Sequence, residues 1–298
     1  MKVGMTLPLM EPGIDGEMLE RWARAVDQGP FASLCFGERV AFGNPELIAL
    51  LGACAAWTRR VRLKTTVVVA PLHDPVWLAK ALATGDLISG GRLTVGLGIG
   101  GREEDYTVMG ADPGERSQAS LARRVAAMRR VWAGEESGSA GAPVGPPPVQ
   151  AGGPELLAGA QGPRAIRAAA QWADGLAGFS FNLNLDEVAA GFELARQAWR
   201  EAQRPAPRLT TAFWFALDDA DRSQLQRHLR HYFNWIDPAT LETMLPTTGF
   251  AGSAEELQQL LHRLEELGTD EVHLIPTSTD LGQLDRIAEL VAGRWSLE

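Results

Sequence analysis

The chain has 298 residues, of which 45% are hydrophobic and 22% charged, so it can bury a large core and does not belong to the disordered class. Its formal net charge is -9 and its Lys and Arg residues are scattered, which argues against nucleic acid and anionic membranes as partners. A (β/α)8 barrel of about 250 residues with insertions accounts for this length. Residues 1–298 are therefore expected to form a single domain.

Short apolar runs alternate with amphipathic stretches of helical length, as expected for parallel strands joined by crossover helices. A doubly wound open sheet shows the same alternation, but the first βα turn lacks a GxGxxG motif, so the predicted α/β fold is a TIM barrel with insertions. The eight predicted strands are Lys2–Leu7, Phe31–Phe36, Val61–Val68, Arg92–Leu97, Glu155–Ala158, Gly175–Ala177, Leu209–Ala216 and Glu271–Ile275. The predicted helices include Gly16–Asp27, Pro45–Trp57, Pro75–Ser89, Arg116–Trp132 and Pro163–Trp172.

Two segments interrupt this alternation. Residues 134–153 are rich in Gly and Pro, which predicts an exposed excursion after the fourth helix. Residues 218–249 add helical material between the seventh and eighth strands, where barrel enzymes commonly place elements that cover the substrate. We therefore expect a lid at 218–249.

The N-terminal sequence and the cysteines bear on where in the cell the protein is located. The N-terminal sequence MKVGMTLPLM lacks the apolar stretch and the cleavage site of a signal peptide, and no apolar run reaches about 18 residues. Cys35 and Cys54 have neither CxxC spacing nor a nearby histidine, so both are expected to be buried thiols. A soluble, cytoplasmic protein is predicted.

The segment GAQGPRAIR, Gly159–Arg167, is the clearest chemical candidate. A predicted strand ends in glycines, and Pro163 stands at the first position of the following helix. Such a turn leaves backbone N–H groups free at the positive end of a helix, where a phosphate binds well. An ordinary glycine-containing βα turn has the same pattern. The positive charge of Arg164 favours the interpretation as an anion-binding turn.

The third and fourth strands carry further candidates at their ends. LKTTVVVAPLHDP, Leu63–Pro75, brings a β-branched run to the barrel rim, although such a run is also typical of any buried parallel strand. In GGRLTVGLGIGGREEDY, Gly90–Tyr106, the alternating glycines indicate room for a flat ligand or a close backbone approach. The acidic run Glu103–Asp105 is a candidate for acid–base chemistry or, alternatively, a charge cluster at a helix N-terminus.

Glu38 and Arg39 end the second strand at the same rim. They are expected either to bind a ligand or to form a salt bridge at the rim.

The five histidines show no metal-binding spacing, and His228 with His231 is interpreted as a surface pair on a helix, so no metal site is predicted. The chain has no GxSxG motif, and neither cysteine has a histidine partner in sequence, which disfavours nucleophilic hydrolysis.

The stretch from NPELIALLGACAAWTRR to GLGIGGREEDY resembles the luciferase-like flavin- and deazaflavin-dependent oxidoreductases. The likeness continues in family order through ELLAGAQGPRAIRAAAQWADGLAG and GFAGSAEELQQLLHRLEELGTDEVHLIPT, over about three quarters of the chain. The resemblance implies a luciferase-like TIM barrel, commonly a homodimer, that binds FMN or coenzyme F420. It also implies a non-prolyl cis peptide at Thr66-Val67 under the cofactor ring, and the cofactor phosphate at Ala160, Gln161, Gly162 and Pro163.

The departures from the family pattern bear on the cofactor. FMN enzymes of the family tend to carry an arginine near the end of strand four, where this chain has Ile99. The deazaflavin branch often has an acid–histidine pair after strand two, where this chain has Glu38-Arg39, and a Glu just past strand four, where it has Gly101. The missing arginine and the Gly162-Pro163 turn favour coenzyme F420, with FMN as the alternative. The cofactor-binding residues expected from these arguments are Thr66, Val67, Ile99, Gly100, Gly159, Ala160, Gln161, Gly162, Pro163 and Arg164.

The predicted reaction is hydride transfer between coenzyme F420 and a small organic substrate, in which the protein supplies orientation and electrostatics. Arg39 is expected to act as an electrophilic or cofactor-orienting group, with Glu38 beside it and Glu104 as a proton-transfer group. Two alternatives stay open. One is an FMN monooxygenase that uses reduced flavin and O2, and the other is a homologue that binds cofactor without catalysis.

Overall fold

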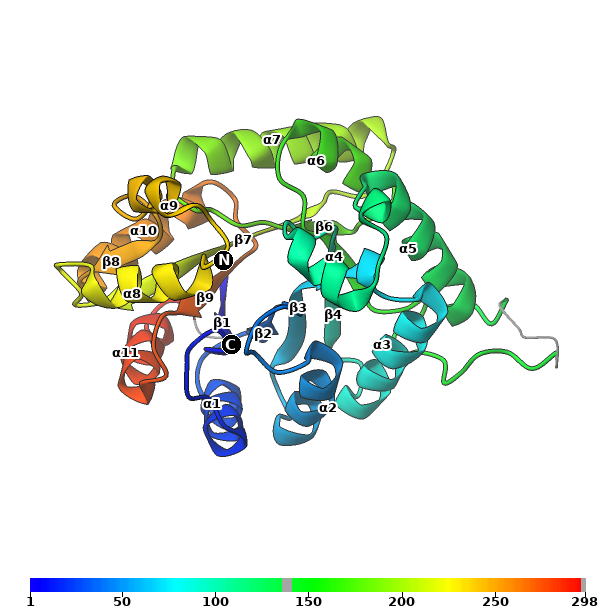
Figure 1. Cartoon of the computed structure of the whole chain (residues 1–298), viewed down its shortest axis with the longest axis horizontal. Helices are drawn as coiled ribbons and strands as arrows, with labels where there is room; N and C mark the ends of the chain where they lie inside the picture. The colour runs from blue at the N-terminus through cyan, green and yellow to red at the C-terminus, as the bar shows by residue number, and fades with distance from the viewer. Residues whose placement is uncertain (136–140, 296–298) are drawn as a thin grey trace. The chain divides into compact units, whose positions relative to one another are not determined.

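The computed structural model describes residues 1–135 and 141–295. The predicted TIM barrel is confirmed: parallel strands join in the order β6-β5-β4-β3-β2-β1-β9-β7, the additional pairing of β6 with β7 closes the ring, and β8 pairs with β7 outside it (Figure 1). The strands are β1 (Lys2–Thr6), β2 (Ser33–Phe36), β3 (Arg62–Val69), β4 (Leu93–Gly98), β5 (Glu155–Ala158), β6 (Gly175–Ala177), β7 (Arg208–Leu217), β8 (Phe250–Gly252) and β9 (Glu271–Pro276).

Most of the helices follow a strand, as βα units require. They are α1 (Gly16–Gln28), α2 (Leu47–Trp57), α3 (Pro75–Ser89), α4 (Glu103–Met109), α5 (Gln118–Trp132), α6 (Pro163–Ala169), α7 (Leu185–Glu201), α8 (Ser223–Tyr232), α9 (Pro238–Met244), α10 (Ala254–Glu266) and α11 (Leu281–Ala292). All eight predicted strands are present within two residues of their expected ends. The short strand β8 was not predicted.

Side-chain caps set several helix starts later than the sequence suggested. Ser117 caps α5 by accepting from the Ser120 N–H, so the helix begins at Gln118 and not at Arg116. Glu46 caps α2 in the same way through the N–H groups of Ile48 and Ala49. The predicted lid segment 218–249 does contain helices, α8 and α9. Of the excursion 134–153, residues 136–140 lie outside the described residues, and the others form turns and irregular structure.

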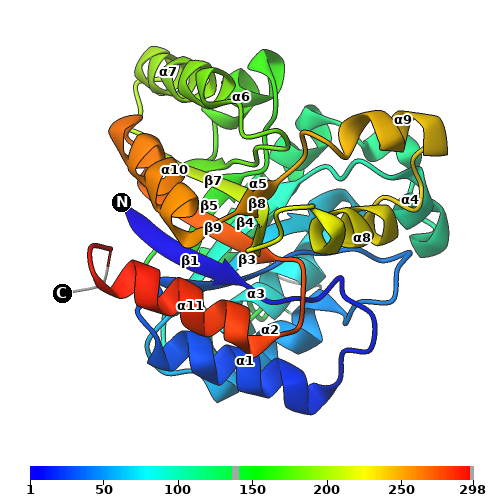
Figure 2. The same ribbon diagram turned by 90° about the vertical axis from the view of Figure 1, so that its left-hand side faces the viewer.

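The chain divides into two compact units. The first comprises Met1–Cys35, Gly178–Glu193 and Leu209–Glu298, and the second comprises Phe36–Ala177 and Leu194–Arg208. Figure 2 shows β1, β9 and β7 of the first unit side by side, with α10 and α11 outside them.

Buried polar groups lie inside the strands of the first unit. Ser33 donates to Glu271 over 2.5 Å, and both side chains are fully buried. A Cβ on Gly4 would lie 2.2 Å from the Ser33 Oγ atom and 3.0 Å from the His273 ring. Gly4 is therefore required because this polar cluster occupies the space that a side chain would need.

The second unit holds α2, α3 and α5, which pack against one another (Figure 1). The Trp132 indole N–H on α5 donates to the Ala79 carbonyl on α3 over 3.0 Å, which fixes these two helices. Cys35 in the first unit and Cys54 in the second are buried thiols outside any disulfide, as predicted, and burial raises the pKa of the Cys54 thiol to about 12. Within the described residues, no helix is both long and apolar enough to cross a bilayer.

Candidate active site

The end of β3 carries an irregularity that distinguishes it from its neighbours. The Thr66-Val67 peptide bond is cis, as the family resemblance implied, and the pairing of β3 with β4 shifts between Thr65 and Val68. Thr65 and Val68 are buried on either side, whereas Thr66 and Val67 are partly exposed. This bulge, Thr66-Val67, is a partly exposed part of β3 toward the carboxyl end of a barrel strand, where sites form in this fold.

Glycines of three neighbouring segments surround the bulge. A Cβ on Gly37 would lie 2.9 Å from the Thr66 carbonyl oxygen, and one on Gly96 would lie 2.3 Å from that of Thr65. Cβ atoms on Gly98 and Gly159 would lie 2.8 and 3.0 Å from the methyl groups of Val67. The alternating glycines of β4 therefore accommodate the close approach of β3 and the Val67 side chain, and not only a flat ligand.

Glu38 is hydrogen-bonded to β3 at two points. Its backbone N–H donates to the Val67 carbonyl over 3.1 Å, and its Oε2 atom accepts from the Val69 N–H over 2.6 Å. The other carboxylate oxygen lies 2.7 Å from His73 Nε2, and both side chains are buried. His73 also stacks on Trp77, with ring centroids 5.8 Å apart.

His73 is the site residue that sequence reasoning missed. An acid–histidine pair was sought in consecutive positions after strand two, where the chain has Glu38 followed by Arg39. The histidine comes instead from the turn after β3, 35 residues further along the chain. The signal available in the sequence was the histidine of the APLHDP segment, which follows β3 at the same barrel rim as Glu38.

Arg39 and Glu104, two of the predicted catalytic residues, differ from each other in burial. Arg39 is only 4% exposed, and its guanidinium carbon lies 3.8 Å from the centre of the Phe42 ring. Glu104 is exposed in the first turn of α4. The buried carboxylate of the acidic run is Asp105, which accepts from the N–H groups of Val40 and Ala41 and pairs with Arg102 at 2.9 Å. Asp105 thus anchors the loop after β2.

The end of β4 is fixed by α4. The Tyr106 hydroxyl donates to the Ile99 carbonyl over 2.6 Å, and burial raises the pKa of that hydroxyl. Gly100 has a φ of 68°, and a Cβ there would lie 2.8 Å from a methyl group of Val69. Ile99 and Gly100 are themselves partly exposed, beside the bulge end of β3.

The glycine turn after β5 leads directly into α6. The Gly159 N–H donates to the Leu97 carbonyl over 2.8 Å, which holds the start of the turn against β4. Gly162 precedes the helix with a φ of 80°, and no side chain caps the first turn of α6. Ala160 is buried, whereas the four residues of the turn that face solvent are Gln161, Gly162, Pro163 and Arg164.

Comparison with known proteins identifies the fold family. Residues 4–281 match the family described as luciferase-like monooxygenase. The chain belongs to this family. The match spans far more than half of the sequence, and it includes the bulge, the Glu38 region and the glycine turn.

Individual relatives are more distant. An uncharacterized protein of Mycobacterium tuberculosis is 35% identical over 161 residues, which cover 52% of this chain and 56% of that protein. The chain thus aligns with little more than half the length of this relative. An F420-dependent secondary alcohol dehydrogenase, solved with an F420-acetone adduct, superposes with a TM-score of 0.81 at 19% identity, covering 98% of this chain and 99% of that one.

A third similar structure is the oxygenating constituent of 3,6-diketocamphane monooxygenase from Pseudomonas putida, in complex with FMN. It superposes with a TM-score of 0.74 at 17% identity, covering 99% of this chain and 98% of that one. At these identities the superpositions show the luciferase-like fold, and both an F420-dependent and an FMN-containing protein share it.

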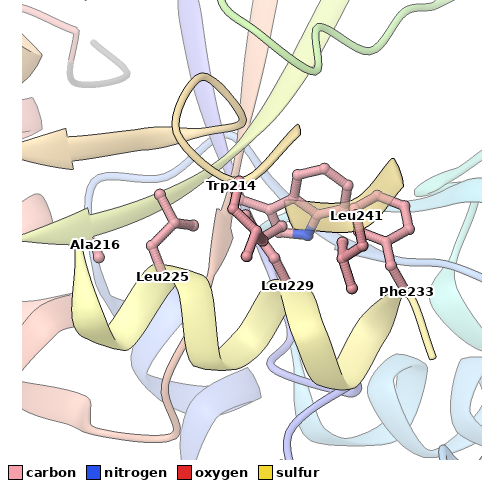
Figure 3. Packing of buried hydrophobic residues seen from close by; sticks show 7 residues of the cluster. Trp214, Ala216, Leu225, Leu229, Phe233 and Leu241 are labelled. Carbon is pink, nitrogen blue, oxygen red and sulfur yellow. The ribbon is translucent and has the colours of Figure 1, made fainter. Parts of the chain in front are cut away.

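In this luciferase-like chain, the helical insertion of the first unit is built around Trp214. Leu225, Leu229 and Phe233 of the α8 segment point toward the indole, and Leu241 of α9 packs beside them (Figure 3). Trp214, Phe215 and Phe233 are buried core residues, whereas Trp235 is 39% exposed. No group of three or more His, Cys, Asp or Glu side chains suited to a metal ion occurs among the described residues.

Proposed function

We propose that this protein is an oxidoreductase that transfers hydride between coenzyme F420 and a small organic substrate. The observation that carries the proposal is the partly exposed bulge Thr66-Val67, which glycines surround and beside which Glu38 forms two hydrogen bonds to β3. A rigid, protruding backbone segment with an apolar valine suits the face of a flat ring system. Such a segment at the carboxyl end of a barrel strand is placed where this fold binds its ligands.

The glycine turn supports binding of the cofactor phosphate. The first turn of α6 has backbone N–H groups that no side chain caps, and Gly162, Pro163 and Arg164 are exposed beside them. Backbone N–H groups, a nearby guanidinium and the absence of bulky side chains are the features that bind a phosphate ester. We assign the ring to Thr66, Val67, Ile99 and Gly100 and the phosphate to the turn from Gly159 to Arg164.

Coenzyme F420 is favoured over FMN by the end of β4. Ile99 is apolar there, and Arg102, the next arginine along the chain, is already paired with Asp105 at 2.9 Å. FMN, used with O2 in a monooxygenase reaction, is the second candidate, because the flavin-dependent trigonelline monooxygenase of Acinetobacter baylyi is 26% identical over 74% of this chain and 64% of that protein.

When bound, the cofactor supplies the centre that accepts or donates hydride. The protein contributes orientation: Glu38 and His73 hold the bulge, and Arg39 places a positive charge in the loop after β2, where we propose that it orients the cofactor. Glu104 is exposed on α4 and is proposed as the proton-transfer group. A small organic molecule is the proposed substrate.

The function is tested by titrating the purified protein with coenzyme F420 and, separately, with FMN while cofactor fluorescence is recorded. We expect saturable binding of F420 with weaker binding of FMN, followed by reduction of bound F420 in a panel of secondary alcohols. Tight binding of FMN without binding of F420 would contradict the proposal and support the FMN monooxygenase instead. Binding of F420 without turnover across the panel would favour a homologue that has lost catalysis.

Replacing Arg39 with alanine should lower the rate of F420 reduction by tenfold or more while the melting temperature falls only modestly. The reason is that the guanidinium is proposed to contribute its charge to the cofactor, and its stacking on the Phe42 ring is worth about 1 kcal/mol. Arg39→Lys should restore part of the rate, and Arg60→Ala, at an exposed position, serves as the control. Unchanged steady-state kinetics in Arg39→Ala would remove this residue from the mechanism.

We further propose that the protein acts as a homodimer through α2 and α3. The helix α2 contains no charged residue, and on α3 the side chains of Trp77 and Ile88 are 50% and 52% exposed. A helix that is apolar all round is typical of a buried helix, so a second copy of the chain is the proposed cover. Neither cysteine forms a disulfide, which fits the reducing cytoplasm as the proposed location.

The change Ile88→Glu is expected to convert the dimer to a monomer, because it places a charge in the apolar face that two copies would bury. Sedimentation velocity at micromolar concentration measures the change. Val108→Glu is the matched control, since Val108 is 65% exposed on α4 and lies outside the proposed face. A wild-type monomer, or a dimer that both variants retain, would contradict the assignment of this face.

A further inference from the structure

The loop after β1 and the helix α8 meet at a buried carboxylate–imidazole pair in the first unit. Glu11 Oε1 lies 2.5 Å from His228 Nδ1, and the two side chains are 9% and 1% exposed. The expectation that His228 and His231 form a surface pair is therefore wrong for His228. On α8 the buried positions are Leu225, His228 and Leu229, a helical spacing that points the imidazole inward.

The second ring nitrogen of His228 has no hydrogen-bond partner among the described residues, and it is shielded from solvent. A buried polar atom without a partner costs about 1–3 kcal/mol, so native proteins keep few such atoms. In the neutral tautomer that donates from Nδ1 to Glu11, the lone pair of the imidazole lies on Nε2. The unpartnered atom is therefore an acceptor that suits a hydroxyl donor.

Aromatic rings surround this imidazole and connect it to the surface. The Tyr232 ring stacks on it at 6.1 Å, and the Trp214 ring centre lies 6.2 Å away. Trp214 in turn contacts Phe181, which is 37% exposed, through ring centres 5.9 Å apart. The imidazole thus lies at the inner end of an apolar, aromatic cluster whose outer members face solvent.

We propose that His228, oriented by Glu11, forms a binding subsite for the hydroxyl group of a small, largely apolar organic molecule. The hydroxyl donates to Nε2, and the apolar remainder packs on Trp214 and the rings beside it. Both residues follow the carboxyl ends of strands, β1 for Glu11 and β7 for His228, where ligands of barrel proteins bind. The subsite does not depend on the identity of the cofactor.

A purely structural pin between the loop and α8 would explain the Glu11 contact alone. It would not require an imidazole, and it leaves the cost of the bare Nε2 atom unexplained, because any neutral donor on α8 would hold the Glu11 carboxylate. A carboxylate that holds one ring nitrogen orients the imidazole, as in binding and proton-transfer sites, and the ring centre of His228 lies 6.2 Å from that of Trp214.

The test uses phenol as the hydroxyl probe and toluene as the matched probe without the hydroxyl. Protein with 15N-labelled histidine is titrated while the imidazole nitrogens are followed by NMR, and tryptophan fluorescence reports affinity. His228→Phe removes both nitrogens but leaves Glu11 without a partner. The double variant Glu11→Leu/His228→Phe removes both polar groups together, and His231→Phe makes the same change at an exposed position of α8.

We expect phenol to shift the His228 Nε2 resonance saturably and to bind about tenfold more weakly to the double variant, the effect of one lost hydrogen bond. Toluene affinity should be unchanged, and His231→Phe should behave as the wild type. The proposal is overturned if phenol fails to bind or leaves the Nε2 resonance unmoved. It is also overturned if both probes lose affinity equally, because the pair is then only a structural pin.

Discussion

Replacing Gly96 with alanine is expected to abolish measurable cofactor binding and to lower the free energy of unfolding by about 3 kcal/mol, the upper range for overpacking a closely packed site. The added Cβ would lie 2.3 Å from the Thr65 carbonyl oxygen, a distance that real side chains do not adopt. That oxygen belongs to the β3 backbone, and the Thr65 hydroxyl donates to the Gly96 carbonyl over 2.9 Å, so neither strand can yield without moving the bulge.

Gly101→Ala is the control for this change. Gly101 lies on the same glycine-rich segment, yet an added Cβ there has no neighbour within 4 Å and the residue needs no left-handed φ. Its free energy of unfolding should stay within about 0.5 kcal/mol of the wild type. Urea titration measures stability, and fluorescence titration with F420 and FMN measures binding at a temperature where both variants are folded. A Gly96→Ala protein that binds cofactor normally would sink the assignment of the ring to Thr66-Val67.

Replacing Glu38 with alanine should have the second largest effect, a loss of about 3 kcal/mol in stability with a tenfold or greater loss in cofactor affinity. The substitution leaves the buried N–H of Val69 without its acceptor and His73 without its partner, and removing one member of a buried polar pair is costly. Of the two hydrogen bonds between Glu38 and β3, the backbone bond from the Glu38 N–H to the Val67 carbonyl would remain.

Glu38→Gln separates the two roles of this side chain. Its amide oxygen can still accept from the Val69 N–H, so the bulge and most of the cofactor affinity should be recovered, whereas the negative charge is lost. If turnover stays low in Glu38→Gln while affinity recovers, the charge itself matters to the reaction. If Glu38→Ala binds cofactor as well as the wild type does, Glu38 does not position the site. Glu103→Gln, an exposed carboxylate on α4, is the control for a change of net charge.

Much of the fold was predictable because it depends on local pattern. The strand Glu155–Ala158 and the strand Gly175–Ala177 were predicted with their observed bounds, since glycines and helix-start signals flank them. The starts of α2 and α5 were predicted less accurately than their last residues. Neighbouring residues could also serve as the N-cap, and the sequence alone does not single out Glu46 and Ser117. The expectation of a single domain stays a prediction.

The candidate site was predictable in part. The cis peptide bond at Thr66-Val67 came from the family resemblance, and the turn before α6 came from the physical rules for glycine and proline at a helix start. The partner of Glu38 was not predictable from neighbouring residues. His73 lies 35 residues further along the chain, and only the folded barrel brings its imidazole to the Glu38 carboxylate. The roles of Arg39 and Glu104 stay proposals, one residue buried against Phe42 and the other exposed on α4.

The sequence by itself determined the alternation of strands and helices, the barrel class and the glycine turn, because each of these depends on residues close together in the chain. Only the tertiary structure decided why Gly96 and Gly98 lack side chains, since the atoms that exclude a Cβ belong to β3. It also decided that His228 is buried against Glu11, 217 residues away. Such contacts depend on strand register and packing, which a local periodicity in hydrophobicity does not encode.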